Sequence, residues 1–141
     1  MKDTAIKARQ LESLGSLINK IPYAKFLGIQ AKIEGDEIGF HLPPSRSHIG
    51  NPTLPAMHGG AMSGFMELSA VLHLLYVMEA PKIPKVVDFS IEYVRAGVLA
   101  DTFARCEVVR QGRKLALVAV TCWQADEKKP IATARVHFLL Q

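Results

Sequence analysis

The most informative segment of the chain is AMHGGAMSGFMELSAVLHLL, residues 56–75. From residue 59 onward it is apolar on nearly every side of a helix, which predicts a helix that the rest of the protein covers all round. Two glycines mark its start, and Pro81 marks its end. One acid, Glu67, lies near its middle. Because burying an ionised carboxylate without partners is unfavourable, Glu67 is a candidate functional residue.

The segment after this helix has the pattern of a half-solvated strand. Residues 85–94, KVVDFSIEYV, alternate between apolar and polar side chains. The alternation predicts one apolar face, which is made of Val87, Phe89, Ile91 and Tyr93.

Three further strands follow, joined by tight turns. Residues 101–110 and 114–124 flank a turn near Gly112, and residues 130–140 follow a polar turn. Short turns between consecutive strands indicate antiparallel pairing. The strand at 114–124 is apolar on both faces, which predicts a central place in the sheet.

On the N-terminal side the pattern is first helical and then extended. Residues 1–22 predict an amphipathic helix that ends by Pro22. Residues 28–42 predict a β-hairpin that turns at Gly35-Asp36. Residues 43–56, four of which are proline, predict a loop.

Together these elements predict the α+β class and, within it, the hotdog fold, in which an antiparallel sheet curls round one long central helix. With 141 residues, 49% of them apolar, the chain is long enough for one domain with a substantial core. We therefore expect a single domain over residues 1–141, with residues 1–22 as its N-terminal helix.

The composition disfavours several classes of function. The net charge of +4 is scattered along the chain, which argues against nucleic-acid binding. The apolar helix has the length of a membrane span, but it carries Glu67, His73 and Ser63, and sheet patterns follow it, so no membrane insertion is expected. The histidines lack the spacing of a zinc site, and Ser63 lies outside a Gly-x-Ser-x-Gly motif.

The cysteines and the N-terminus predict the compartment. Cys106 and Cys122 fall on neighbouring strands, where position 106 should face about position 118, so the two are offset and a disulfide is not expected. Unpaired cysteines favour a reducing compartment. The N-terminal residues contain no apolar run like that of a secretory signal, and a cytoplasmic location is the expectation.

Four features occur in a fixed order along the chain. They are His58-Gly59-Gly60, an acid nine residues after the histidine, a strand with the pattern Val-Asp-x-x-x-x-Tyr, and a Gly-Arg-Lys turn before an apolar strand. In this order they resemble the PaaI-like group of hotdog acyl-CoA thioesterases, within the 4-hydroxybenzoyl-CoA thioesterase superfamily. The resemblance covers roughly residues 50–138.

The resemblance implies hydrolysis of an acyl-CoA or acyl-carrier-protein thioester, with no metal and no cofactor beyond the coenzyme A of the substrate. It assigns the oxyanion hole to His58-Gly59-Gly60, chiefly to the Gly59 N–H, and makes Glu67 the nucleophile or the general base. The family has an Asn about six residues before the histidine; Asn51 lies seven residues before it, without the glycine that usually follows. Many members carry Ser or Thr where this chain has Val86.

These residue types suit the reaction chemically. Backbone N–H groups in the first turn of a helix have no partner within the helix, and the helix dipole helps them to hold an oxyanion. Glycines let a substrate carbonyl approach the backbone closely. A carboxylate in an apolar site is a stronger base or nucleophile than one in water.

Helix geometry predicts a site that two subunits share. Glu67 follows Gly60 by seven residues, roughly 10 Å along a helix axis, so one thioester carbonyl cannot contact both. We therefore expect the glycines of one subunit to face Glu67 of another. The expected assembly is a homo-oligomer of at least two subunits. The larger assembly that we expect is a dimer of dimers, which is a homotetramer.

Several residues are candidates for contacts with the substrate. Gly60 would border the thioester, and an apolar acyl pocket would be lined by Phe65, Leu68, Leu72 and Tyr93. Arg110, Arg113 and Lys114, around the hairpin turn, either contact the phosphates of coenzyme A or are simply solvated.

Other interpretations stay open on the sequence alone. The two glycines can be a flexible helix entry, His58 can serve only to cap or pack, and Glu67 can be a structural carboxylate that loop N–H groups satisfy. A hotdog dehydratase or hydratase also pairs a histidine with an acid. A protein that binds acyl thioesters without hydrolysing them is a third alternative, which Val86 and the altered Asn51 segment favour.

Overall fold

The computed structural model of the protein describes residues 4–51, 53–78 and 83–140. Its helices are α1 (Thr4–Lys20), α2 (Pro22–Leu27) and α3 (Gly59–Met78), with a 3-10 turn, η1, at Arg46–His48. Its strands are β1 (Gln30–Glu34), β2 (Glu37–Leu42), β3 (Ile49–Asn51), β4 (Leu54–Met57), β5 (Lys85–Tyr93), β6 (Thr102–Gln111), β7 (Leu115–Trp123) and β8 (Ala132–Leu139).

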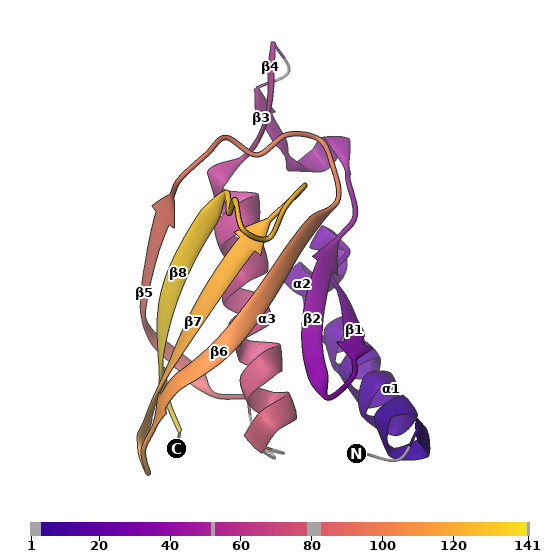
Figure 1. Ribbon diagram of the computed structural model, residues 1–141, viewed down its shortest axis with the longest axis vertical. Coiled ribbons are helices and arrows are strands. Elements are labelled where there is room, and N and C mark those ends of the chain that lie inside the picture. The colour runs from indigo at the N-terminus through magenta and orange to yellow at the C-terminus, as the bar shows by residue number, and fades with distance from the viewer. Residues whose placement is uncertain (1–3, 52, 79–82, 141) are drawn as a thin grey trace.

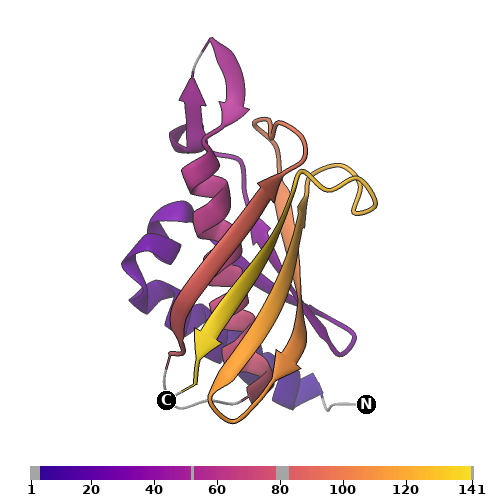
Figure 2. The ribbon, with the colours of Figure 1, turned by 90° about the vertical axis from the view of Figure 1, so that its left-hand side faces the viewer.

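Six strands form one antiparallel sheet in the order β1-β2-β6-β7-β8-β5. The sheet curls round α3, while α1 and α2 pack against α3 and α1 also contacts β1 (Figures 1 and 2). β7 lies in the middle of the sheet, as its apolar pattern predicts, and β1 and β5 form the edges. This arrangement confirms the predicted hotdog fold.

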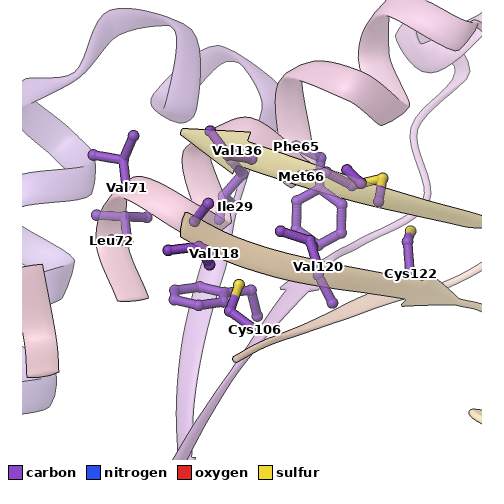
Figure 3. Packing of buried hydrophobic residues seen from close by; sticks show 14 of the residues in the cluster. Ile29, Phe65, Met66, Val71, Leu72, Cys106, Val118, Val120, Cys122 and Val136 are labelled. Carbon is purple, nitrogen blue, oxygen red and sulfur yellow. The ribbon is translucent and has the colours of Figure 1, made fainter. Parts of the chain in front are cut away.

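α3 supplies much of the hydrophobic core. Its Phe65 and Met66 belong to the same buried cluster as Val118 and Val120 of β7, and Figure 3 shows part of this cluster. By length and composition α3 is the one helix of the described chain that could cross a membrane, yet 61% of its apolar window is buried inside the fold. The curled sheet therefore accounts for the apolar character of α3.

Two glycines with positive φ angles shape the chain, one just before β1 and one between β1 and β2. Gly28, with φ of 83°, ends α2, and its N–H donates to the carbonyls of Ala24 and Lys25. Gly35, with φ of 64°, forms the turn between β1 and β2. A residue with a side chain is strained at such angles. The predicted hairpin at 28–42 is therefore confirmed, together with its turn.

The segment 43–56 differs from the predicted loop. It contains η1 and most of a two-stranded hairpin, β3 and β4, which projects beyond the start of α3 (Figure 1). Ile49 lies opposite Met57, and the Met57 N–H donates to the Gly97 carbonyl at 2.8 Å. β4 is thus supported by the segment between β5 and β6, a contact that the local sequence pattern does not contain.

β-Bulges change two predicted registers. In β5 the pairing with β8 skips Val87, so that Val86 packs against the core opposite Phe138 and Val87 is 52% exposed. The predicted apolar face was therefore wrong at Val87, because one extra residue reverses the side to which the strand's side chains point. In β6 a bulge at residue 109 puts Cys106 opposite Val120, two residues from the predicted position.

Both cysteines are free and buried. Burial raises the pKa of the Cys122 thiol to about 12, and it raises the pKa of the Cys106 thiol further. Because the thiolate is the reactive form of cysteine, both side chains are inert in the folded protein at neutral pH.

Candidate active site

His58 lies just before α3 and caps it. The His58 Nδ1 atom accepts a hydrogen bond from the Gly60 N–H at 2.9 Å, and the His58 carbonyl accepts from the N–H groups of Ala61 and Met62. The His58 N–H in turn donates to the His48 carbonyl at 2.6 Å. The Gly60 N–H is therefore occupied by the cap.

The N–H of Gly59, the first residue of α3, is left without an acceptor. No residue that the structure describes accepts a hydrogen bond from it. Gly59 borders an open hollow of about 330 Å³, whose lining also includes Met57, Met62, Tyr93 and Arg95. A free amide beside open space, at the positive end of a 20-residue helix, suits the binding of an oxyanion.

The carbonyl of Gly59 has a partner from the sheet. The hydroxyl of Tyr93, the last residue of β5, donates to this carbonyl at 2.9 Å. A Cβ atom at position 59 would lie 3.1 Å from the Tyr93 hydroxyl oxygen and 3.3 Å from the adjoining ring carbon. Both distances are shorter than ordinary contacts, so a side chain at this position would make Tyr93 give way by a few tenths of an ångström, whereas glycine accommodates it as it stands.

Glu67 lies on the less buried side of the first half of α3. Gly60, Ser63 and Glu67 follow one another at spacings of three and four residues, so they share a face, and all three retain some exposure. Within the described part of the chain, Glu67 forms no hydrogen bond or ion pair. The described loops therefore do not supply the donors that a purely structural carboxylate would use.

Gly59 and Glu67 are not brought together within one protomer. They lie on the same helix, eight residues apart, which corresponds to about 12 Å of helical rise. A single reacting carbonyl can contact only one of them. A site that contains both groups would need a second copy of the chain.

The three basic residues named from the sequence do lie together. Arg110, Arg113 and Lys114 line an open hollow of about 410 Å³ beside the β6–β7 turn, together with His137. This turn lies at the end of the sheet opposite to the start of α3 (Figure 1). β6, whose ten residues span about 30 Å, leads from one end to the other. In one protomer the basic residues are therefore far from Gly59.

The other named residues lie outside these two hollows. Asn51 ends β3 in the projecting hairpin, where its backbone pairs with Leu54 and Ala56. Phe65 is fully buried in the core, and Val86 is half-buried opposite Phe138. The contacts of Asn51 and Phe65 with a substrate stay predictions.

Two tyrosines near the start of α3 have roles that the sequence analysis misses. Tyr93 was expected in the wall of an acyl pocket, whereas its hydroxyl donates to the Gly59 carbonyl. Tyr23 of α2 lies against Gly64, where a Cβ atom would be 2.5 Å from its ring, and its hydroxyl lies 3.4 Å from the Gly60 carbonyl oxygen. The only signal for Tyr93 was its place at the end of the Val-Asp-x-x-x-x-Tyr pattern.

Known proteins share this architecture. The family described as the acyl-CoA thioesterase N-terminal domain matches residues 49–139. No protein of curated function matches the chain significantly.

Solved structures match nearly the whole chain. A protein from Chromobacterium violaceum is 37% identical, with 96% of this chain and 95% of that chain covered and a TM-score of 0.77. A thioesterase from Haemophilus influenzae is 21% identical, with coverage of 92% and 88% and a TM-score of 0.79. Zebrafish thioesterase superfamily member 2 is 19% identical, with coverage of 93% and 98% and a TM-score of 0.77. The last two likenesses concern the fold alone.

Proposed function

Because the chain belongs to the acyl-CoA thioesterase family, we propose that it hydrolyses the thioester bond of an acyl-CoA to give the free acid and the thiol of coenzyme A. The observation that carries this proposal concerns two groups on α3 that have no partner among the described residues. They are the N–H of Gly59 and the half-buried carboxylate of Glu67. One is a donor for a developing oxyanion, and the other is a base or nucleophile.

In the proposed reaction the Gly59 N–H donates to the thioester carbonyl oxygen as that oxygen becomes negative. The dipole of α3 adds to this stabilisation. Glu67 either attacks the carbonyl carbon or removes a proton from the water that attacks it. The C–S bond then breaks and the thiolate leaves, which requires no strong acid. If water attacked, the product is the free acid. If Glu67 attacked, the acyl group is left on Glu67 as a mixed anhydride, which a water molecule then hydrolyses to the free acid. These steps use no metal and no cofactor, since coenzyme A enters as part of the substrate.

We further propose that two protomers build each site. β5 is an edge of the sheet, and exposed apolar side chains lie on it or just after it, namely Val87, Tyr93 and Val94. Protein assemblies usually pair or cover such an edge. Antiparallel pairing of two β5 strands would turn the partner end for end, so that its β6–β7 turn would come to the end of the assembly where Gly59 lies. We expect two such dimers to form a tetramer.

The basic residues of that turn favour coenzyme A as the thiol part of the substrate. Arg110, Arg113 and Lys114 carry three positive charges around one hollow. The nucleotide part of coenzyme A presents several phosphate groups, whereas a carrier protein presents one phosphate on its pantetheine arm. Three cations in one place therefore suit coenzyme A better.

The compartment is part of the same proposal. Cys106 and Cys122 are free and buried, which is compatible with a reducing environment. We therefore propose a cytoplasmic enzyme.

The test is thiol release from a panel of aryl and fatty acyl-CoAs. Since both protein cysteines are buried with raised pKa values, a thiol reagent reports the released coenzyme A alone. We expect turnover of at least one acyl-CoA, and a loss of at least about a thousandfold in kcat for Glu67→Gln. Glu34→Gln, which removes an exposed carboxylate from β1, is the matched control and should keep wild-type activity.

Two results would contradict the proposal. Hydration of an enoyl-CoA without thiol release would identify a dehydratase or hydratase. Tight binding of acyl-CoAs without turnover would identify a silent acyl-thioester binder, which is the alternative that Val86 favours because its side chain has no hydroxyl to hold a water.

A further inference from the structure

Two side chains hold opposite ends of one peptide unit at the start of α3. The Tyr93 hydroxyl donates to the Gly59 carbonyl at 2.9 Å, and His58 Nδ1 accepts from the Gly60 N–H at 2.9 Å. This carbonyl and this N–H belong to the same peptide, in which they point in opposite directions. The Gly59–Gly60 peptide is therefore fixed from both sides.

Such a restraint matters because Gly59 has unusual conformational freedom. A residue without a Cβ atom can change its backbone angles at little energetic cost, and its N–H would then take up many directions. As the first residue of α3, Gly59 also has no intrahelical acceptor for that N–H. That N–H belongs to the His58–Gly59 peptide, whose carbonyl accepts from the N–H groups of Ala61 and Met62. With the following peptide fixed as well, both peptides that flank Gly59 are held, and the free N–H keeps one direction.

We propose that Tyr93 is a positioning residue of the oxyanion hole, whose hydroxyl holds the Gly59–Gly60 peptide so that the Gly59 N–H points at the reacting oxygen. The inference rests on the proposed thioesterase function. Tyr93 acts through Gly59 and does not touch the reacting atoms. A Cβ atom at position 59 would lie 3.1 Å from the Tyr93 hydroxyl oxygen, so glycine lets the hydroxyl approach the peptide without displacement.

The backbone that carries Tyr93 is itself well anchored. The N–H groups of Val94 and Arg95 both donate to the Ile131 carbonyl, at 2.8 and 3.1 Å. The Arg95 guanidinium also donates to the Pro130 carbonyl at 2.6 Å. The hydroxyl of Tyr93 is thus presented from a fixed point at the end of the sheet, as a preorganised donor requires.

The test compares Tyr93→Phe with Tyr23→Phe. Both variants remove one phenolic hydroxyl, but the Tyr23 hydroxyl lies 3.4 Å from the Gly60 carbonyl, which the Ser63 hydroxyl also contacts at 3.2 Å. Of the two tyrosines, Tyr93 alone bonds to the Gly59–Gly60 peptide, because the Gly60 carbonyl belongs to the next peptide. We expect Tyr93→Phe to lower kcat and kcat/KM equally, by about tenfold, with KM unchanged, because the lost interaction acts in the transition state. Tyr23→Phe should stay within about twofold of wild type.

A second measurement uses NMR to observe the Gly60 amide, which belongs to the Gly59–Gly60 peptide. The protein contains ten glycines, so selective ¹⁵N-glycine labelling gives a simple amide spectrum. Loss of the bond to the Gly59 carbonyl should move the Gly60 amide resonance in Tyr93→Phe and leave it in place in Tyr23→Phe. Circular dichroism and the elution volume should be those of wild type for both variants.

The outcomes separate this inference from the function on which it rests. A wild-type protein that hydrolyses no acyl-CoA overturns the proposed function. An active wild type with a Tyr93→Phe variant of unchanged kcat overturns the positioning role alone, as does an unmoved Gly60 resonance. A Tyr93→Phe variant that loses activity only through a raised KM would also overturn it, because the hydroxyl would then act in substrate binding.

Discussion

The Nδ1 atom of His58 lies 2.9 Å from the Gly60 nitrogen and accepts its hydrogen. The bond requires the tautomer in which Nδ1 is unprotonated. His58 is thus the N-cap of α3, and the same bond leaves the Gly59 N–H as the free amide of the glycine pair. A capping role for this histidine, which the sequence left open beside a chemical one, follows from this contact.

If the main role of His58 is to cap α3, an asparagine at position 58 should perform the same role. Asparagine is among the preferred N-cap residues, whereas alanine is a poor one and costs about 1 kcal/mol of stability. We expect His58→Asn to keep kcat within about threefold of wild type and His58→Ala to lower both kcat and the melting temperature. Equal losses of kcat in the two variants, with His58→Asn fully folded, would show that the imidazole takes part in the chemistry.

The basic residues at the β6–β7 turn should act on affinity for coenzyme A and not on the chemical step. We expect the triple change of Arg110, Arg113 and Lys114 to Ala to raise KM for acyl-CoA about tenfold, with kcat unchanged. The same variant should hydrolyse the corresponding acyl-N-acetylcysteamine thioester, which lacks the phosphates, like wild type.

A charge-matched control removes three exposed lysines elsewhere. Lys20, Lys25 and Lys32, on α1, α2 and β1, should be dispensable for KM when changed together to Ala. A tenfold rise of KM in this control as well would mean that net charge, and not the hollow at the turn, attracts the substrate.

The stability of the protein should depend on the titration of His73. Burial lowers the pKa of this α3 histidine below its ordinary value of 6.5, and its Nδ1 has no hydrogen-bond partner among the described residues. The unfolded chain therefore binds a proton more readily than the folded one, so this group's contribution to stability is lost as the pH falls below about 6.5. The slope from one such group is at most about 1.4 kcal/mol per pH unit.

Urea unfolding at pH 7.5 and pH 5.5, at fixed protein concentration, measures this contribution. We expect His73→Gln, which cannot titrate, to lose less stability than wild type between the two pH values. An identical pH dependence in wild type and variant would show that His73 titrates alike in the folded and unfolded states.

The main elements of the fold were predictable because their patterns are local. The helix α3 is apolar on nearly every side, and the strand β7 is apolar on both faces, so other elements must cover each of them completely. Few folds of this size meet both conditions. The β3–β4 hairpin and the bulges in β5 and β6 were not predictable in this way. They depend on contacts between distant segments, such as the bond between Met57 and Gly97.

The candidate site was predictable in its residue types and not in its contacts. Glu67 stands out as an acid in an apolar helix, and Gly59 as a glycine at the start of that helix. The bond between Tyr93 and Gly59 joins residues 34 positions apart, and no periodicity encodes it. The wide separation between Gly59 and the basic turn likewise follows from the strand order. The assignment to the PaaI-like group and the shared site stay predictions.

The central claim is that Glu67 of one protomer and the Gly59 N–H of another form one site, and mixed oligomers test it most directly. One chain carries Glu67→Gln; the other carries Gly59→Pro, which removes the N–H at the first helical position, where proline is tolerated. Differently tagged chains are co-expressed, and oligomers that contain both are purified and shown to be folded.

Each parent oligomer should be inactive, whereas a mixed dimer has one site with both an intact Glu67 and an intact Gly59. We predict that kcat per mixed dimer recovers to about half of the wild-type value. Mixed oligomers as inactive as the two parents would contradict a site shared between protomers.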